Sequence, residues 1–164
     1  MINNQSPPSV IPADAGIQDF RGQRDARIHG HDESGAHGGV INTARIMLSV
    51  ILPTFNERQN IGPLIGAVLG ALREDVEVVV VDDDSPDGTG DVVAAICEGD
   101  PRVRLVRRRR GLGLASAIRD GVEAARGDLV AWMDCDFSMP PAALPVMRKA
   151  LDSVDIVVGS RYVG

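Results

Sequence analysis

The stretch "VEVVVVDDDSPDGT", residues 76–89, decides the fold. Five of its first six residues are valine. A continuous run of β-branched residues is typical of a strand buried on both faces, and such strands occur in parallel sheets covered by helices. The run then changes at once into three aspartates, Asp82 to Asp84, and a turn sequence. The stretch therefore predicts a central strand of a parallel sheet whose carboxyl end carries acidic groups.

The same pattern continues on both sides of this strand. Further apolar runs predict strands at 47–52, 103–106, 129–133 and 155–159. Apolar residues at helical spacing, together with Pro-opened segments, predict helices at 61–72, 91–97, 114–125 and 140–151. Strict alternation of strand and helix is the pattern of an α/β fold. We therefore expect one α/β domain over 47–164, with a Rossmann-like, mostly parallel sheet flanked by helices.

Residues 1–46 differ in composition from the rest of the chain. They are rich in Gly, Pro, Asn, Gln and Ser, show no apolar periodicity, and hold all three histidines. Such composition is typical of a disordered segment. The stretch "PSVIPADAGIQ" (8–18) also resembles a translated intergenic repeat. We therefore expect 1–46 to be a disordered or artefactual extension, with the true start at Met47.

Composition limits the class of protein. Hydrophobic residues make up 44% and aromatic residues 3%, so the core must be aliphatic. The two cysteines, Cys97 and Cys135, show no metal-type spacing, which favours a reduced, cytoplasmic protein. No apolar run approaches the roughly 18 residues of a transmembrane helix. The net charge of −6 argues against general nucleic-acid binding.

Six arginines crowd into the nine residues 102–110. One interpretation is a solvated loop. The other is a basic rim that binds phosphate groups or an anionic membrane surface. The second interpretation implies peripheral contact with the inner face of a membrane, and composition alone leaves both open.

Polar residues follow most of the expected strands. "PTFNE" (53–57), "DDDSPDGT" (82–89), "DCDFS" (134–138) and "SRY" (160–162) each come directly after an apolar run. A single Asp at a strand end is usually a helix cap or a turn residue. In parallel sheets, however, all carboxyl ends meet at one edge, which is where ligands bind. The shared pattern predicts a functional site at this edge.

Asp134 and Asp136 pose a specific question, because one residue separates them. If the strand continues through them, the pleat places both carboxylates on one side. Two such charges repel unless a cation lies between them. A hard divalent ion, Mg²⁺ or Mn²⁺, suits these oxygens and also takes oxygens of a bound diphosphate. Ser138 could lend a third oxygen, and Arg161 a fixed charge for phosphate.

Three rival sites do not fit the sequence. A nicotinamide-binding fold needs glycines at the first strand–helix turn, and "PTFNE" has none; "GLGLAS" (111–116) lacks the third glycine. A P-loop needs Gly-Lys-Ser/Thr, and the only lysine is Lys149. A receiver domain has a lysine after a late strand, where this chain has Arg161. Nucleophile schemes built on histidine are disfavoured because 47–164 contains none.

Five stretches together resemble a known family in order and spacing. They are "VILPTFNERQNI", "VVVVDDDSPDGTGD", "GLGLASAIRDGVEAARGD", "MDCDFSMPP" and "VVGSRYVG". These motifs are similar to those of the dolichyl- or polyprenyl-phosphate mannose synthases, which are inverting family-2 glycosyltransferases with a GT-A fold. The resemblance covers essentially all of 47–164.

The resemblance implies a function and a set of residues. The donor would be a nucleotide sugar, GDP-mannose, and the acceptor a polyprenyl phosphate, with Mg²⁺ or Mn²⁺ as cofactor. The implied nucleotide-sugar-binding residues are Pro53, Phe55, Glu57, Val81, Asp83, Asp134, Cys135, Asp136 and Arg161. The metal would bind Asp134 and Asp136, helped by Ser138. The catalytic residues would be Asp136 and Arg161.

The chain also departs from the family pattern. Phe55 stands where tyrosine is common, Cys135 replaces the usual alanine, and Met139 sits where histidine is frequent. The sequence stops at Gly164, so we expect 47–164 to be a donor-binding domain that is incomplete at its C-terminus. Two alternatives stay open: another nucleotide sugar such as UDP-glucose, and a non-catalytic nucleotide-binding fragment.

Overall fold

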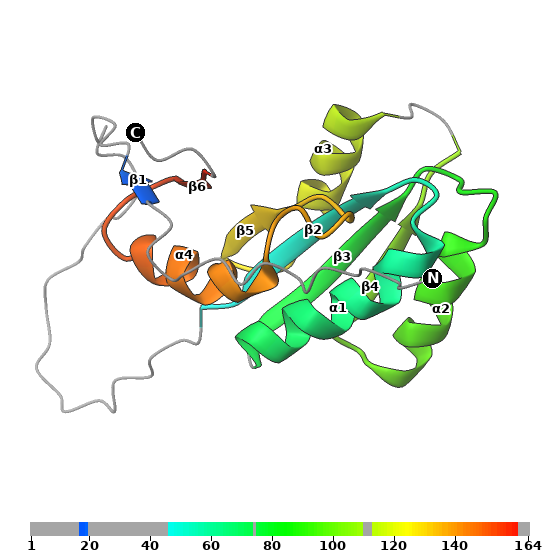
Figure 1. Ribbon diagram of the computed structural model, residues 1–164, viewed down its shortest axis with the longest axis horizontal. Helices are drawn as coiled ribbons and strands as arrows, with labels where there is room; N and C mark the ends of the chain where they lie inside the picture. The colour runs from blue at the N-terminus through cyan, green and yellow to red at the C-terminus, as the bar shows by residue number, and fades with distance from the viewer. Residues whose placement is uncertain (1–16, 20–45, 74, 110–112, 161–164) are drawn as a thin grey trace, which may run out of the picture.

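The computed structural model describes residues 17–19, 46–73, 75–109 and 113–160 (Figure 1). Strands and helices alternate along the chain. Their order is β1 (Ile17–Asp19), β2 (Leu48–Thr54), α1 (Arg58–Leu72), β3 (Val76–Asp82), α2 (Thr89–Gly99), β4 (Val103–Arg107), α3 (Leu114–Ala124), β5 (Leu129–Trp132), the 3-10 helix η1 (Pro141–Ala143), α4 (Leu144–Ala150) and β6 (Val157–Gly159).

A four-stranded parallel sheet forms the centre, in the order β4-β3-β2-β5. The register places Val50 beside Val78 on one side and beside Ala131 on the other. Every residue of β2 and β3 is buried, as the continuous apolar runs predict for inner strands. The expected α/β fold with a parallel sheet flanked by helices is therefore confirmed.

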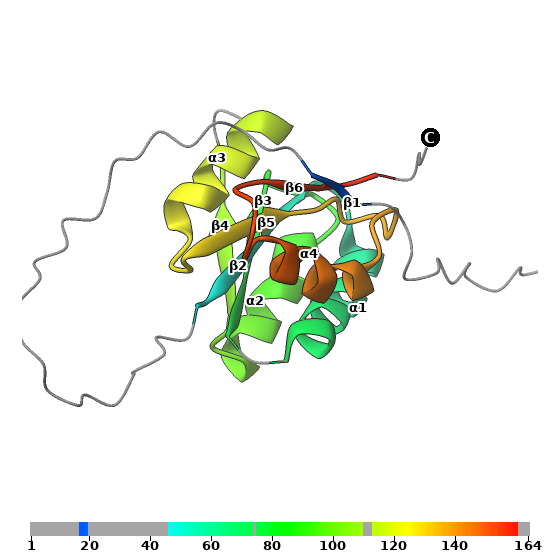
Figure 2. The ribbon, with the colours of Figure 1, turned by 90° about the vertical axis from the view of Figure 1, so that its left-hand side faces the viewer.

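Helices cover the two faces of the sheet unequally (Figure 2). One face packs against α1, α2 and α4 around a large core cluster that includes Leu52, Leu64 and Val93. The other face packs mainly against α3 through a smaller cluster, Ile51, Val79, Val81 and Ala117. The alternate residues of β2 and β3 thus point into two separate aliphatic layers, as the period of two requires.

Helix α3 lies very close to the sheet at Gly121. A Cβ atom added at Gly121 would lie 2.3 Å from Cγ2 of Ile51 and 3.1 Å from Cγ2 of Val81. No side chain fits in that space, so the glycine allows α3 to approach β2 and β3 directly. This approach brings the first turn of α3 toward the carboxyl end of β3.

A buried polar network fastens the opposite, amino end of the sheet. Ser49 Oγ donates to Glu77 Oε1 at 2.6 Å, and the Gly127 N–H donates to Ser49 Oγ at 2.8 Å. The Arg126 N–H also donates to Glu77, and Arg104 Nη1 lies 3.3 Å from Glu77 Oε2. Burial raises the pKa of Glu77, but these hydrogen bonds and the arginine outweigh burial, so its pKa lies below its ordinary value.

The last strand departs from the prediction. We expected 155–159 to be a fifth strand of the parallel sheet. Instead β6 pairs antiparallel with β1, with Ile17 opposite Gly159, in a separate two-stranded sheet. A short apolar run is compatible with many strand partners, and its sequence does not specify which one it takes. The residues 17–19 also form a strand within the segment 1–46 that we expected to be disordered or artefactual; the rest of 1–45 lies outside the described residues.

Candidate functional site

Three loops meet at the carboxyl edge of the sheet, because β2 lies between β3 and β5 (Figure 1). The loops follow Thr54, Asp82 and Trp132. The Asp83 N–H donates to the Thr54 carbonyl at 3.1 Å, which ties the second loop to the first. The sequence-predicted site residues at 53–57, 81–83 and 134–138 are therefore brought to one edge, as expected.

The end of β2 and the first loop carry Pro53, Phe55 and Glu57. Pro53 lies in β2 opposite Val81 of β3. The Phe55 ring is 56% exposed, so it offers a free aromatic face at the edge. Glu57 is the N-cap residue of α1; its N–H donates to Thr89 Oγ1 at 2.9 Å, and its carboxylate accepts a hydrogen bond from Asn60 Nδ2 at 2.7 Å.

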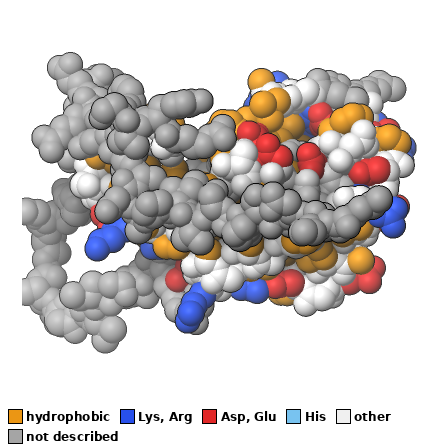
Figure 3. All heavy atoms as spheres, viewed as in Figure 1, with side chains coloured by type: hydrophobic (Ala, Val, Ile, Leu, Met, Phe, Trp, Pro, Cys, Tyr) orange, Lys and Arg blue, Asp and Glu red, His pale blue; other side chains and the backbone are white. Residues whose placement is uncertain are grey.

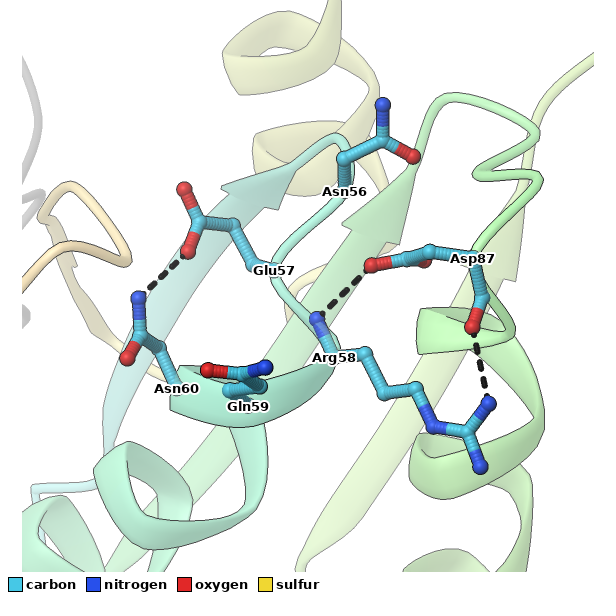
Figure 4. A pocket seen from close by; sticks show the side chains of 6 residues that line it. All are labelled: Asn56, Glu57, Arg58, Gln59, Asn60 and Asp87. Carbon is cyan, nitrogen blue, oxygen red and sulfur yellow. Dashed lines mark hydrogen bonds between the residues drawn. The ribbon is translucent and has the colours of Figure 1, made fainter.

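A polar pocket opens beside this loop at the start of α1 (Figure 4). It is lined by Asn56, Glu57, Arg58, Gln59, Asn60 and Asp87. Asp87 is committed to its own turn: Oδ1 accepts the Thr89 N–H at 2.9 Å, and Oδ2 accepts the Arg58 N–H at 3.1 Å. Hydrogen bonding from Thr89 holds the pKa of Asp87 below its ordinary value. Asp87 thus acts as a turn residue that joins α1 to α2.

Strand β3 ends at Asp82 and the second loop begins with Asp83; both aspartates are buried. Asp82 accepts hydrogen bonds from both the hydroxyl and the N–H of Ser85, as a turn aspartate does. Asp83 is held differently: its Oδ1 lies 2.7 Å from Arg108 Nε, and its Oδ2 accepts the Gly113 N–H at 2.7 Å. The Val81 side chain is fully buried, so a ligand would meet only its main chain.

The third loop corrects one expectation about Asp134 and Asp136. Strand β5 ends at Trp132, so the strand pleat does not orient these two carboxylates. Asp134 is half-buried and Asp136 is exposed; Asp136 Oδ1 accepts the Ser138 N–H at 2.8 Å. Phe137 has φ of 60°, a left-handed conformation that is rare for a bulky residue. A turn at 135–136 therefore presents Asp136, while Asp134 lies in the link between β5 and that turn.

Cys135 points inward between the two aspartates. Its thiol is buried and donates to the Pro53 carbonyl at 3.4 Å, which ties the third loop to the first. Burial raises the pKa of the Cys135 thiol to about 12. The thiol is therefore neutral and structural, and only the main chain of Cys135 is available to a ligand.

The oxygen donors at this edge fit a divalent ion whose coordination is completed by oxygens of the substrate. No group of three or more His, Cys, Asp or Glu side chains suited to a metal occurs in the described part of the chain. A protein-only cage is thus lacking there, while the loop offers carboxylates of Asp134 and Asp136. Mg²⁺ and Mn²⁺ commonly use one or two carboxylates and complete their coordination with water and phosphate oxygens. The residues present fit such an ion.

Most described arginines of 102–110 form ion pairs with carboxylates of the same chain. Ion pairs join Arg102 to Asp100, Arg104 to Glu77, and Arg107 to Asp91. Arg108 is buried and pairs with two carboxylates. On the face viewed in Figure 3, the Lys and Arg side chains that are not covered by grey atoms are scattered and not gathered into one patch. Neither expected interpretation, solvated loop or basic rim, holds for Arg108; Arg109 is exposed, and Arg110 and Arg161 lie outside the described residues.

Sequence reasoning missed Arg108 and its partners in α3, Ser116 in the first turn and Asp120 in the middle of the helix. A signal was present, because Arg108 follows an apolar strand at the same sheet edge as the acidic loops. The charge run around it hid that signal, since consecutive arginines suggest solvent exposure.

Comparison with known proteins identifies the family. Residues 49–164 match the model of the family described as glycosyl transferase family 2. The chain belongs to glycosyl transferase family 2. This family 2 chain is 42% identical over 118 residues to a dolichol-phosphate mannosyltransferase of Pyrococcus furiosus, covering 71% of this chain and 33% of that protein. It is 40% identical over 119 residues to a polyprenol monophosphomannose synthase of Mycolicibacterium smegmatis, covering 70% of this chain and 44% of that protein. The chain thus spans less than half the length of each of these two relatives.

Solved structures agree with the family assignment. A mannosyltransferase from Pyrobaculum calidifontis in complex with GDP-Man and Mn²⁺ is 34% identical with a TM-score of 0.53, covering 66% of this chain and 33% of that one. A glucosyl-3-phosphoglycerate synthase from Mycobacterium tuberculosis, in complex with Mn²⁺, UDP and phosphoglyceric acid, is 28% identical with a TM-score of 0.53, covering 67% and 40%. The expected GT-A-type fold and family resemblance are confirmed.

Within the described ranges, the family 2 chain has no helix that is both long and apolar enough to cross a bilayer.

Proposed function

We propose that this family 2 glycosyltransferase moves mannose from GDP-mannose to a polyprenyl phosphate, dolichyl or undecaprenyl, with inversion at the anomeric carbon. The observation that carries the proposal is the meeting of the Phe55, Asp83 and Asp134–Asp136 loops at one sheet edge. The 42% identity to a dolichol-phosphate mannosyltransferase supports the acceptor, and the related structure with GDP-Man and Mn²⁺ supports the donor.

The first two loops would bind the nucleoside. The exposed Phe55 ring offers a stacking surface for a base or ribose. Pro53, Glu57 and the Val81 main chain would line the same side. Asp83 would accept hydrogen bonds from the base or the ribose, because a carboxylate offers about four lone-pair sites and only two are used here.

The third loop would hold the diphosphate. Asp134 and Asp136 would bind Mg²⁺ or Mn²⁺, with Ser138 as an additional oxygen, and the Cys135 main chain would approach the donor. A bound divalent ion would offset the charge that grows on the departing diphosphate. Arg161 would contribute a second positive charge for phosphate, so that Asp136 and Arg161 are the proposed catalytic residues.

The chemistry demands little acid–base help from the protein. An oxygen of the acceptor phosphate attacks the anomeric carbon, the bond from that carbon to the donor diphosphate breaks, and GDP leaves with the bonding electrons. The acceptor phosphate is already an anion near neutral pH, so no strong general base is required. The absence of histidine from 47–164 fits this reaction. The protein's contribution is then positioning and electrostatic stabilisation.

We propose that the protein contacts a membrane peripherally, because a polyprenyl phosphate acceptor lies in a membrane. The internal pairing of Arg107 and Arg108 weakens the argument from the arginine run. A second candidate donor is UDP-glucose, because a glucosyltransferase structure with UDP is also similar, at 28% identity.

A binding and transfer assay on the full chain tests the proposal. Trp132 is the only tryptophan and lies two residues before Asp134, so its fluorescence can report ligand binding at the edge. We expect GDP to bind with Mn²⁺ and much more weakly after metal removal. Asp136→Ala should abolish the metal dependence, whereas Asp152→Ala, an exposed aspartate outside the site, should not.

Transfer is then measured with GDP-mannose or UDP-glucose and a polyprenyl phosphate in detergent. We expect mannosylated polyprenyl phosphate and GDP as products only with GDP-mannose and a metal ion. Equal GDP affinity with and without Mg²⁺ or Mn²⁺ would contradict the proposed site.

A further inference from the structure

Arg108 occupies an unusual position for a residue in a charge run. It is the first residue after β4, and its N–H donates to the Asp82 carbonyl at 2.9 Å. Its side chain is only 4% exposed. The guanidinium therefore lies inside the molecule, between the carboxyl end of β3 and the first turns of α3.

The guanidinium connects groups from two elements. Nε lies 2.7 Å from Asp83 Oδ1, and Nη1 lies 2.9 Å from Asp120 Oδ2. Nη2 donates to Ser116 Oγ at 3.0 Å. A buried charge must be paired and hydrogen-bonded, and here both conditions are met. The planar fork of an arginine fixes the directions of these contacts, which the point charge of a lysine would not do.

The contacts leave Asp83 with a fixed orientation. Arg108 holds one carboxylate oxygen, and the Gly113 N–H donates to the other at 2.7 Å. Gly113 has φ of +126°, a conformation that other residues rarely adopt, so this turn geometry favours glycine. Ser116 Oγ in turn donates to the Gly113 carbonyl at 2.9 Å. Both oxygens of the Asp83 carboxylate are thus held, and its side chain keeps 11% exposure just beyond the carboxyl end of β3.

We propose that Arg108 is a positioning residue for recognition of the nucleoside of the donor. It holds the Asp83 carboxylate in the orientation that accepts N–H or O–H donors of the base or ribose, and it fixes the start of α3 in the same act. The inference rests on the proposed function, because that function places the nucleoside at Asp83.

A positioning role and a merely structural ion pair predict different binding patterns. A structural role would change stability and would alter all ligands alike. A positioning role changes the affinity for the nucleoside part and spares the diphosphate part. The test therefore compares GDP with inorganic pyrophosphate, both titrated with Mn²⁺ into the full chain.

Arg108→Met removes the charge and the hydrogen bonds while keeping much of the side-chain length. We expect it to weaken GDP binding by about tenfold to hundredfold, the usual effect of losing a group that orients a ligand residue. Pyrophosphate affinity should stay within about twofold of the parent protein, since the third loop is untouched. Arg109→Met makes the same chemical change at the exposed neighbour and should leave both affinities unchanged.

Two further variants keep the test decisive if Arg108→Met does not fold. Arg108→Lys retains the charge and loses the fork, so it should keep the melting temperature closer to that of the parent while GDP binding still weakens. In the Asp83→Asn background, replacing Arg108 should weaken GDP binding little further, because both changes act on one carboxylate.

Several results would overturn the inference. Unchanged GDP affinity in both Arg108 variants would do so, as would equal losses for GDP and pyrophosphate, or fully additive losses with Asp83→Asn. Failure of the parent protein to bind GDP with Mn²⁺ at all would instead remove the proposed function on which the inference rests.

Discussion

The close approach of α3 to the sheet makes Gly121→Ala a sharp test of the packing. The added methyl would lie 2.3 Å from Cγ2 of Ile51, where carbon atoms normally stay roughly 3.5–4.0 Å apart. Ile51 is fully buried in an inner strand and cannot move aside easily. Overpacking of this kind costs about 3 kcal/mol at the upper end of its usual range. Alanine recovers about 1 kcal/mol of helix propensity.

The expected net loss is therefore about 2 kcal/mol of unfolding free energy, which corresponds to a fall of about 6 to 10 °C in Tm. Urea unfolding and differential scanning calorimetry on the full chain measure both quantities. Gly66→Ala in α1 is the matched control, because a Cβ there meets nothing within 4 Å. It should stabilise the protein by up to about 1 kcal/mol through helix propensity alone.

A second background separates overpacking from other causes. Ile51→Ala removes the methyl group that Gly121→Ala would strike. In that background, Gly121→Ala should cost little or should stabilise. If the cost of Gly121→Ala is the same in both backgrounds, or if Gly121→Ala and Gly66→Ala shift Tm alike, the close approach described for α3 is wrong.

Three further predictions follow from the structure. The pKa of Glu77 is lowered on folding, so its contribution to stability is present above its ordinary pKa of about 4.3 and is lost as pH falls below that value. Glu77→Gln should therefore reduce the dependence of the unfolding free energy on pH, measured by urea titrations in acid. An unchanged pH dependence would contradict the buried network. Burial raises the pKa of the Cys135 thiol to about 12, so iodoacetamide at pH 8 should label Cys135 in urea but not in the native protein. Mass spectrometry of the peptide that contains Cys135 measures this labelling. Rapid labelling of the native protein would refute the inward placement of the thiol. Ser138→Ala should weaken Mn²⁺-dependent GDP binding only several-fold, about 1 kcal/mol, because the Asp136 contact uses the Ser138 main-chain N–H and not the hydroxyl. Titration calorimetry measures this affinity. Complete loss of GDP binding would assign the hydroxyl a larger role.

The sequence predicted the sheet and the edge well, for physical reasons. Inner strands such as β3 must be apolar on both faces, which leaves an unbroken valine run that is easy to read. Parallel strands end at one edge, so polar residues after each run locate the site without further information. These two rules account for the inner strands and for the grouping of Asp83 with Asp134 and Asp136.

Other features depended on partners that a local pattern does not contain. Residues 157–159 are apolar enough for a strand, yet nothing in them indicates pairing with 17–19. Asp134 and Asp136 lie beyond β5, which stops at Trp132, and an apolar run does not fix its own last residue. Arg108 is buried because two carboxylates distant in sequence converge on it, which the neighbouring arginines conceal.

The network around Glu77 has a practical consequence. Glu77 and Asp83 lie six positions apart on one extended segment, a distance of roughly 20 Å. The Glu77 network thus contributes to acid sensitivity at one tip of the domain, whereas sugar-nucleotide chemistry is proposed for the other. Substitutions at Ser49, Glu77 and Arg104 could therefore change the thermal stability and the acid stability of the protein without altering the proposed catalytic edge.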